Sequence, residues 1–193
     1  MDYPVSLDVA VPERVANWRP LVNWILAIPH LLIANVLGNV GGVIALISWF
    51  AILFTGQLPE GLANLQCLVI RYQQRAYAYA LFLHEQYPKF EFAMTPQDPG
   101  GDAVRLTFAP QLENRNRLTV GLRILWAIPY LLFTAALLIA GVVVVVIGFF
   151  AVLFTGQWPE GLRNFVIGVM RVSARASSYV YLLNDQYPPF ALD

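Results

Sequence analysis

The sequence of 193 residues has little charge, one cysteine and two histidines. Lys, Arg, Asp and Glu make up 12% of the chain, which is about half the share of a soluble globular domain. The twelve basic and twelve acidic residues cancel, so no net field attracts a polyanion, and we expect no nucleic-acid partner. The single cysteine, Cys67, cannot form an internal disulfide.

Motifs that carry enzyme chemistry are also missing. The chain contains no HExxH, no GxSxG, no phosphate-binding glycine loop and no cluster of metal ligands. The two histidines, His30 and His84, stand alone in the sequence. No charged residue lies deep in the long apolar runs, and a proton relay in a membrane usually needs one. We therefore predict that the protein is not an enzyme and uses no cofactor or metal.

What the sequence does have is an internal repeat. FAILFTGQLPEGLANL from Phe50 aligns with FAVLFTGQWPEGLRNF from Phe150, and HEQYPKF from His84 aligns with NDQYPPF from Asn184. Both matches have the same shift of 100 residues, without a gap. The matches include polar and turn residues, which chance similarity between apolar segments does not explain. The sequence therefore predicts two tandem copies of one unit.

Each unit contains one long apolar run, at residues 21–54 and 120–154, in a chain that is 58% hydrophobic. A single helix of 35 residues would be about 52 Å long, whereas the hydrocarbon core of a bilayer is about 30 Å thick. The length predicts a short transmembrane helical hairpin in each unit, at residues 19–55 and 120–155, with turns near residues 38–42 and 140–141. A wedge that enters and leaves the same leaflet is the alternative.

All twelve Lys and Arg residues lie outside the expected turns of these hairpins. The positive-inside rule then places both termini and the segments between the hairpins in the cytoplasm of a bacterium, with the protein passing several times through its inner membrane. An even number of crossings in each unit makes the two repeats parallel, related by an axis along the membrane normal.

An amphipathic helix is predicted after each hairpin, at residues 59–86 and 159–185. Its start is indicated by a proline at the first position followed by an acidic residue, which suit the positive end of a helix. The residues of this structural motif are Gly56, Pro59, Glu60 and Gly61 in the first unit and Gly156, Pro159, Glu160 and Gly161 in the second.

Paired arginines on these helices are the candidate binding site. They are Arg71 and Arg75 with Asn64 in the first unit, and Arg171 and Arg175 with Asn164 in the second. A helix of this kind can lie in the headgroup layer, where its arginines bind a lipid headgroup or another anion. Two other interpretations stay open: an ordinary solvated or snorkelling face, and pairing with Glu60 or Glu160.

Alternation of apolar and polar residues predicts short strands at residues 3–9, 90–94 and 104–108. The turn-rich segment TPQDPGGD at 95–102 is expected to join the second and third strands as a hairpin, and residues 190–192 could add an edge. The units therefore span residues 1–94 and 103–193, with 95–102 as a linker. The predicted fold is a mainly α integral membrane protein with a small antiparallel β-sheet on its cytoplasmic side.

The motif FTGQxPEGL, the paired arginines and the closing DQYPPF resemble a family of bacterial membrane proteins, frequent in actinobacteria, that is catalogued as a domain of unknown function. The resemblance covers nearly the whole chain, with Lys89 in the place of the second proline of the first unit. It implies a membrane location and a duplicated unit, and it implies no activity.

These features favour a non-enzymatic membrane protein: a scaffold, an accessory subunit or a lipid-binding or membrane-shaping protein that acts from the cytoplasmic face. Its expected partners are membrane lipids, with a membrane protein complex or further copies of itself as additional candidates. The alternative function is a small oligomeric channel or transporter, in which Asn35, Asn39 and Ser48 would face neighbouring helices.

Overall fold

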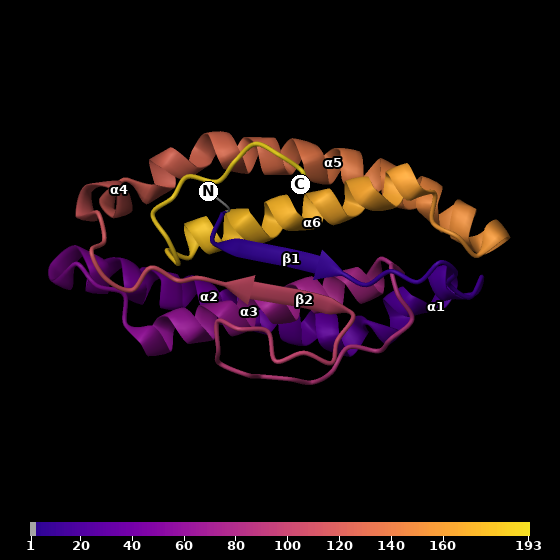
Figure 1. The fold of residues 1–193 in the computed structure, drawn as a ribbon, viewed down its shortest axis with the longest axis horizontal. Helices are drawn as coiled ribbons and strands as arrows, with labels where there is room; N and C mark the ends of the chain where they lie inside the picture. The colour runs from indigo at the N-terminus through magenta and orange to yellow at the C-terminus, as the bar shows by residue number, and fades with distance from the viewer. Residues whose placement is uncertain (1–2) are drawn as a thin grey trace.

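The computed structural model describes residues 3–193, so Met1 and Asp2, the first residues of the predicted first unit, lie outside the described part (Figure 1). The elements are β1 (Val5–Val9), α1 (Arg19–Leu26), α2 (Ile28–Thr55), α3 (Glu60–Ala80), β2 (Val104–Phe108), α4 (Arg117–Gly121), α5 (Arg123–Thr155) and α6 (Glu160–Val180). The order strand, short helix, long helix, second helix occurs twice, which is the architecture expected of a duplicated, mainly helical chain.

The predicted hairpins are wrong, because α2 and α5 are each one continuous helix. Glycine inside a helix costs only about 1 kcal/mol relative to alanine, so Gly38 and Gly41 do not force a turn. They serve close packing instead: a Cβ on Gly41 would lie 3.1 Å from both Tyr181 and Val69, and Tyr181 donates a hydrogen bond to the carbonyl of Gly38 at 3.4 Å. Both helices are long and apolar enough to cross a membrane.

Helices α3 and α6 begin at Glu60 and Glu160, directly after the prolines of the motif and one residue later than predicted. They end earlier than predicted, because Phe82 and Leu182 have positive φ angles of 47° and 66°, which a helix cannot continue through. The structure places both helices inside the fold and not on an outer surface. Helix α3 packs between α2 and β2, and α6 packs between α5 and β1.

The sheet is small and antiparallel, as predicted, but it pairs different strands. Strand β1 lies beside β2, with Leu7 opposite Leu106. The prediction of strands at residues 90–94 and 190–192, and of a hairpin through 95–102, is wrong, since these segments are not strands. The alternation at 90–94 reflects alternating contacts of an irregular segment: Phe92 stacks on Tyr72, while Glu91 pairs with Arg75.

The two units are related by an approximate two-fold axis. Helices α2 and α5 run in opposite directions along the long axis of the molecule (Figure 1). The segment before each long helix meets the end of the other one: the N–H of Val15 donates to the carbonyl of Gly156 at 2.8 Å, and that of Arg115 donates to Gly56 at 3.2 Å. The two units therefore interlock at both ends as well as through the sheet.

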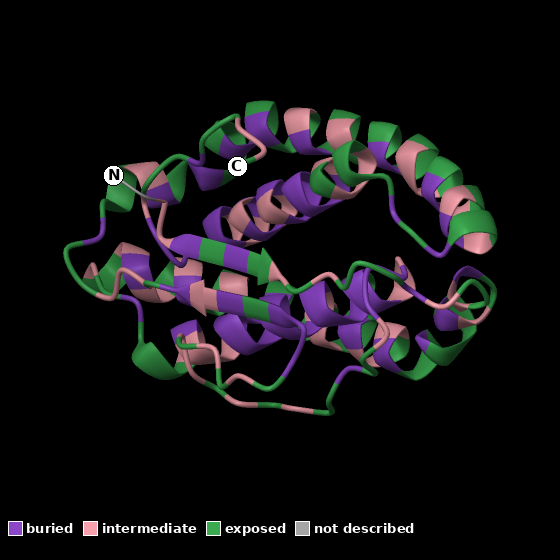
Figure 2. Cartoon of the chain, turned by 45° about the vertical axis from the view of Figure 1, so that its right-hand side comes forward, coloured by how far each residue is buried: buried purple, intermediate pink, exposed green. Residues whose placement is uncertain are grey.

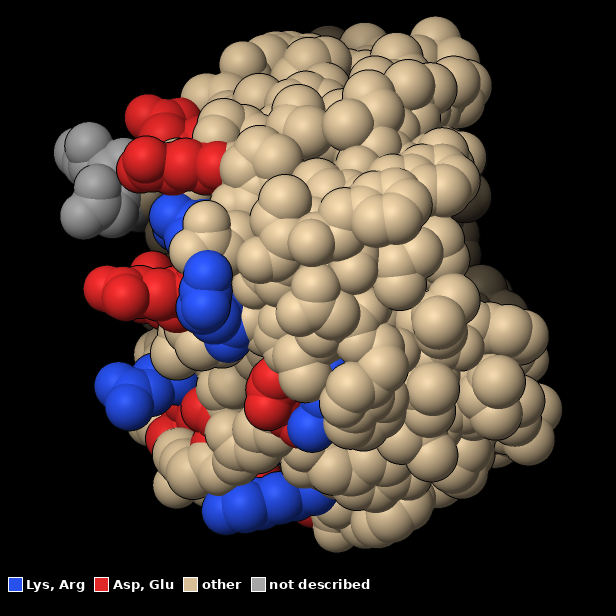
Figure 3. Space-filling model, turned by 90° about the vertical axis from the view of Figure 1, so that its right-hand side faces the viewer, with Lys and Arg blue, Asp and Glu red and all other residues tan. Residues whose placement is uncertain are grey.

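The surface of the molecule is divided into a charged side and an apolar side. Large apolar residues are exposed along the whole outward side of α2 and α5, from Ile28 to Phe54 and from Ile124 to Phe154 (Figure 2). Viewed along the long axis, Lys, Arg, Asp and Glu gather on one side, and the opposite side shows no charge (Figure 3).

One pair of residues breaks the two-fold symmetry in the core. Gly148 lies against the indole of Trp158, where the first unit has Ser48 and Leu58. A methyl group on Gly148 would overlap the Trp158 ring. That ring is fixed by stacking on Phe82 and by its hydrogen bond to the Phe82 carbonyl.

Gly148→Ala is therefore expected to lower the free energy of unfolding by about 1–3 kcal/mol through overpacking. In a Trp158→Leu background the same change should be neutral or stabilising, because the overlap is gone and alanine favours a helix over glycine by about 1 kcal/mol. Urea unfolding in detergent of the native chain, the two single variants and the double variant gives the coupling free energy between the two positions. Equal effects in both backgrounds would show that the ring moves aside freely.

Candidate functional site: two arginine clusters

The first arginine cluster lies between α3 and β2. Arg71 and Arg75 are one turn apart on α3, and both side chains are only 3% exposed. The Nε atom of Arg71 donates to the carbonyl of Leu106 at 3.2 Å, and that of Arg75 donates to Val104 at 3.2 Å. The two guanidinium groups are thereby held against the outer edge of β2.

The loop that follows the first unit closes over this cluster. Glu91 accepts a hydrogen bond from Arg75 at 2.6 Å, and Asp98 accepts two from the same guanidinium at 3.1 and 3.2 Å. The carbonyls of Thr95 and Gln97 accept from Arg71 at 2.8 and 3.0 Å. Burial lowers the pKa of Arg71, and the charge of Asp98 opposes that shift. The arginines of the first unit are therefore internal ligands of a loop, not a surface site for lipid headgroups.

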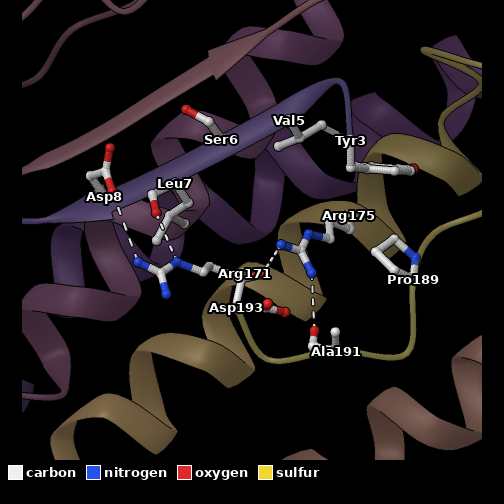
Figure 4. Close-up of a pocket in the computed structure, with 10 residues that line it drawn as sticks. All are labelled: Tyr3, Val5, Ser6, Leu7, Asp8, Arg171, Arg175, Pro189, Ala191 and Asp193. Carbon is white, nitrogen blue, oxygen red and sulfur yellow. Dashed lines mark hydrogen bonds and ion pairs between the residues drawn. The ribbon is translucent and has the colours of Figure 1, made fainter. Parts of the chain in front are cut away.

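The second cluster, on α6, is the repeat of the first but is partly exposed. The Nε of Arg171 donates to the carbonyl of Leu7 on β1 at 3.1 Å, and Arg171 lies 3.9 Å from Asp8, whose side chain is 78% exposed. Arg175 donates to the carbonyl of Ala191 at 3.0 Å and to a main-chain oxygen of Asp193. A cavity of about 520 Å³ opens over these arginines (Figure 4).

The other predicted site residues lie apart from the cavity. Asn64 and Asn164 stand seven residues before the first arginine of each pair, near the starts of α3 and α6, and neither side chain makes a hydrogen bond within residues 3–193. Glu60 and Glu160 stand at the first positions of these helices and form no ion pair with the arginines in that part of the chain.

The glycines of the motif have structural positions. Gly56 and Gly156 end the long helices with positive φ angles of 76° and 69°, which glycine adopts without strain. A Cβ on Gly61 or Gly161 would meet no atom within 4 Å, so these two positions tolerate a side chain. The motif therefore marks the turn between two helices.

A further group of charged residues, which the sequence did not suggest, surrounds Asp185 and holds the chain around α4. Asp185 accepts hydrogen bonds from Arg115 at 2.8 Å, from Arg123 at 2.6 Å and from the N–H of Asn116 at 2.8 Å. Its repeat partner, Glu85, accepts one from the N–H of Ala16 at 2.5 Å. In both units this carboxylate accepts a hydrogen bond from a main-chain N–H of the segment before α1 or α4. Only the folded structure reveals this contact.

This cluster predicts a pH dependence of stability. Burial raises the pKa of Asp185, but the hydrogen bonds from Arg115 and Asn116 and the charges of Arg115 and Arg123 lower it below its ordinary value. The carboxylate therefore stabilises the fold above about pH 4, and this contribution is lost as the pH falls through the folded-state pKa. Asp185→Asn should lower the free energy of unfolding at about pH 7 and lower it less at about pH 3, because part of the carboxylate's contribution is lost below its ordinary pKa.

The matched control is Glu85→Gln, since Glu85 is 41% exposed and its nearest cation, Arg19, is 3.7 Å away. Its effect at neutral pH should be smaller than that of Asp185→Asn. Urea unfolding at the two pH values measures both. If Asp185→Asn lowers the free energy of unfolding equally at both pH values, the shape of the side chain and not its charge matters at this position.

Comparison with known proteins supports the repeat. No curated protein and no solved structure matches the chain. One family model, described as Domain of unknown function (DUF4389), matches twice, at residues 17–91 and 117–191. The two matches leave out β1, β2 and residues 95–98, and they contain both pairs of arginines. They cover most of the chain, which therefore belongs to this family of unknown function, as a tandem duplication of its domain.

Proposed function

We propose that the chain is a non-enzymatic membrane protein whose two long helices lie along one leaflet, with the sheet and the arginine clusters held on the cytoplasmic side as a face for a binding partner. The observation that carries this proposal is the apolar outward side of α2 and α5, which lies opposite the charged side (Figure 3). An exposed apolar surface of this extent favours lipid over water.

Helix length supports an orientation along the membrane. The 33 residues of α5 extend about 50 Å, and the 28 residues of α2 about 42 Å, against a hydrocarbon core of about 30 Å. To fit its whole length within this core, α5 would need a tilt of roughly 53° from the membrane normal. Spanning helices have tilts of about 0–40°. A helix that lies in the leaflet meets no such limit.

The position of the charges supports the same orientation. Asp8 and Arg105 are opposite each other in the sheet, which lies near the middle of the long axis (Figure 1), and both are exposed. If α2 and α5 crossed the bilayer, these charges would lie at its centre, at a cost of about 2.5–3.5 kcal/mol each. With the helices flat, the same residues face water. The twelve Lys and Arg residues then lie off the lipid-facing surface, and we assign their side to the cytoplasm.

A scaffold fits this geometry better than a pore. Asn39 donates to the carbonyl and side-chain oxygens of Asn35, so the amide group of Asn39 has its acceptors on α2 itself. Their counterparts on α5 are Ala135 and Ile139, which cannot continue a polar lining. Insertion of two long helices into one leaflet would instead expand that leaflet, and this would shape the membrane around the protein.

Cysteines at Gly61 and Gly161 test the orientation. The two glycines lie in the first turns of α3 and α6, which start at opposite ends of the long axis (Figure 1), and neither position is crowded. If the helices lie in the inner leaflet, Gly61→Cys and Gly161→Cys should both resist a membrane-impermeant thiol reagent in intact cells and both react in inside-out vesicles. The native Cys67 is fully buried and serves as the unreactive background.

Labelling of one of the two cysteines from outside would contradict the proposal, because crossing helices place the two ends on opposite sides. Release of the protein from washed membranes by alkaline carbonate would also contradict it. A cysteine at exposed Arg105, which faces water in the flat orientation, should react like the two end positions and is the control for access.

A further inference from the structure

The two outer edges of the sheet differ. At the edge of β2, the N–H of Phe108 donates to the carbonyl of Pro96 at 2.9 Å, and the N–H of Leu106 donates to a carboxylate oxygen of Asp98 at 2.7 Å. Residues 96–98 therefore run along β2 and supply the acceptors that a third strand would supply. The same Asp98 carboxylate binds Arg75.

The outer edge of β1 has no such cover within residues 3–193. Leu7 lies opposite Leu106 in the antiparallel register, and its carbonyl accepts from Arg171 as that of Leu106 accepts from Arg71. In an antiparallel pair, residues opposite each other have the same hydrogen-bonding direction, so the N–H of Leu7 also points away from β2. In the described part of the chain no group accepts a hydrogen bond from it.

The segment that follows α6 covers only part of the second cluster. Ala191 and Asp193 provide oxygens for Arg175, at the repeat positions of Glu91 and Ala93. In the first unit residues 95–98 lie across both arginines, whereas among the described residues Arg171 contacts only the carbonyl of Leu7 and, at 3.9 Å, Asp8. The cavity of about 520 Å³ lies there, between β1, α6 and the segment ending at Asp193 (Figure 4).

We propose that this cavity binds an extended acidic peptide segment of a partner protein, which adds along the outer edge of β1 and places a carboxylate against Arg171 and Arg175. The first unit shows the chemistry: carbonyls for one arginine, a carboxylate for the other, and acceptors for the strand edge. Strand addition supplies affinity through main-chain hydrogen bonds, and an arginine–carboxylate pair supplies specificity. A cavity of this volume is within the range of about 300–1,000 Å³ for ligand sites.

Two observations favour a peptide over a lipid headgroup. The cavity is on the side of the sheet, whereas the apolar outward side of α2 and α5 would meet lipid. A free strand edge, with the Leu7 N–H beside an arginine-bound carbonyl, matches a peptide backbone and has no counterpart in a headgroup. The weak contact of Asp8 with Arg171 would be exchanged for a carboxylate of the ligand. This inference names the kind of partner that would bind the cytoplasmic face proposed above. Peptide binding itself does not depend on the membrane orientation.

The probe is a fluorescent peptide with the sequence of residues 94–101, MTPQDPGG, added to the full chain in nanodiscs. Fluorescence anisotropy should show saturable binding. Arg171→Gln and Arg175→Gln should each weaken it at least about tenfold, as expected for loss of a charge-assisted hydrogen bond. Arg163→Gln, on the same helix but outside the cavity, is the matched control and should bind as the native chain does.

Two further measurements remain informative if an arginine variant folds poorly. A peptide with Asp98→Asn should bind at least about tenfold more weakly to the unchanged protein. Amide hydrogen exchange at Leu7 should slow when the peptide is added. The proposal is overturned if the Asn peptide binds equally, if Leu7 exchange is unaffected, or if phosphatidylglycerol vesicles or inorganic phosphate displace the peptide completely, since the site would then bind anions or headgroups.

Discussion

Replacing Arg75 by methionine is expected to lower the free energy of unfolding by about 3–5 kcal/mol, because removing one partner of a buried ion pair leaves the other with weaker compensation. Asp98 would keep only Arg71 as a cation, at 3.6 Å. Asp98 is 8% exposed and Glu91 is 28% exposed, and both depend on this guanidinium. The carbonyl of Val104 would lose its hydrogen bond as well. The loop over β2 should loosen together with the core beneath it. Urea unfolding in detergent measures the change.

The repeat provides the control, which is Arg175→Met at the equivalent position. Arg175 is partly exposed, and its partners are main-chain oxygens near a cavity, so its loss should cost about 1 kcal/mol or less. Asp98→Asn should cost less after Arg75→Met than before, because the two residues form one network. Similar costs for Arg75→Met and Arg175→Met would contradict the difference between a closed and an open cluster.

Four lysines on the outward side of α5 are expected to reduce binding to liposomes at least about a hundredfold. The positions share one side of the helix and are exposed: Leu132, Ile139, Val143 and Ile147. A lysine at the bilayer centre costs about 2.5–3.5 kcal/mol, so four such lysines set an upper limit of about 10–14 kcal/mol. A helix that lies in one leaflet is nearer the headgroups, so the cost there is smaller. Side chains that extend to the headgroups reduce this, and a hundredfold change needs only about 2.8 kcal/mol.

The control for this experiment carries alanine at the same four positions, which removes the same contacts without adding charge. Flotation of the purified proteins with liposomes measures binding, and circular dichroism shows whether each variant remains helical. The alanine protein should float nearly as well as the native chain. Equal flotation of the lysine and alanine proteins would mean that this side of α5 does not contact lipid.

Much of the fold could be predicted from the sequence, because its signals are local. The proline and acid at Pro59 and Glu60 marked the start of α3, and alternation located β1 and β2. The continuous long helices could not be predicted, because hydrophobicity shows that a run avoids water but not in which direction it lies. The length argument assumed a crossing and so required a turn. That Gly41 accommodates Tyr181, a residue 140 positions away, is a property of the packed structure.

The candidate site could be predicted only in part. Comparison of the repeats selected the paired arginines, since they recur at a shift of 100 residues. It could not reveal their different environments. Asp98, the main ligand of Arg75, lies in a segment that has no repeat partner within the sequence, and its neighbours Pro96 and Pro99 gave it the appearance of a turn residue. The partners of a buried cation follow from tertiary contacts, which repetition does not encode.

The register of β1 against β2 also suggests how such a chain could have arisen. Leu7 faces Leu106, so the sheet resembles an isologous contact in which each unit offers an equivalent strand to the other. An ancestral gene with one unit would have encoded an unpaired strand, and a second copy of the same polypeptide would have been its natural complement. Such a homodimer would have had two identical clefts. In a fused pair the two clefts no longer need to stay alike, and in the described residues the first cleft is closed by residues 95–98 while the second is open.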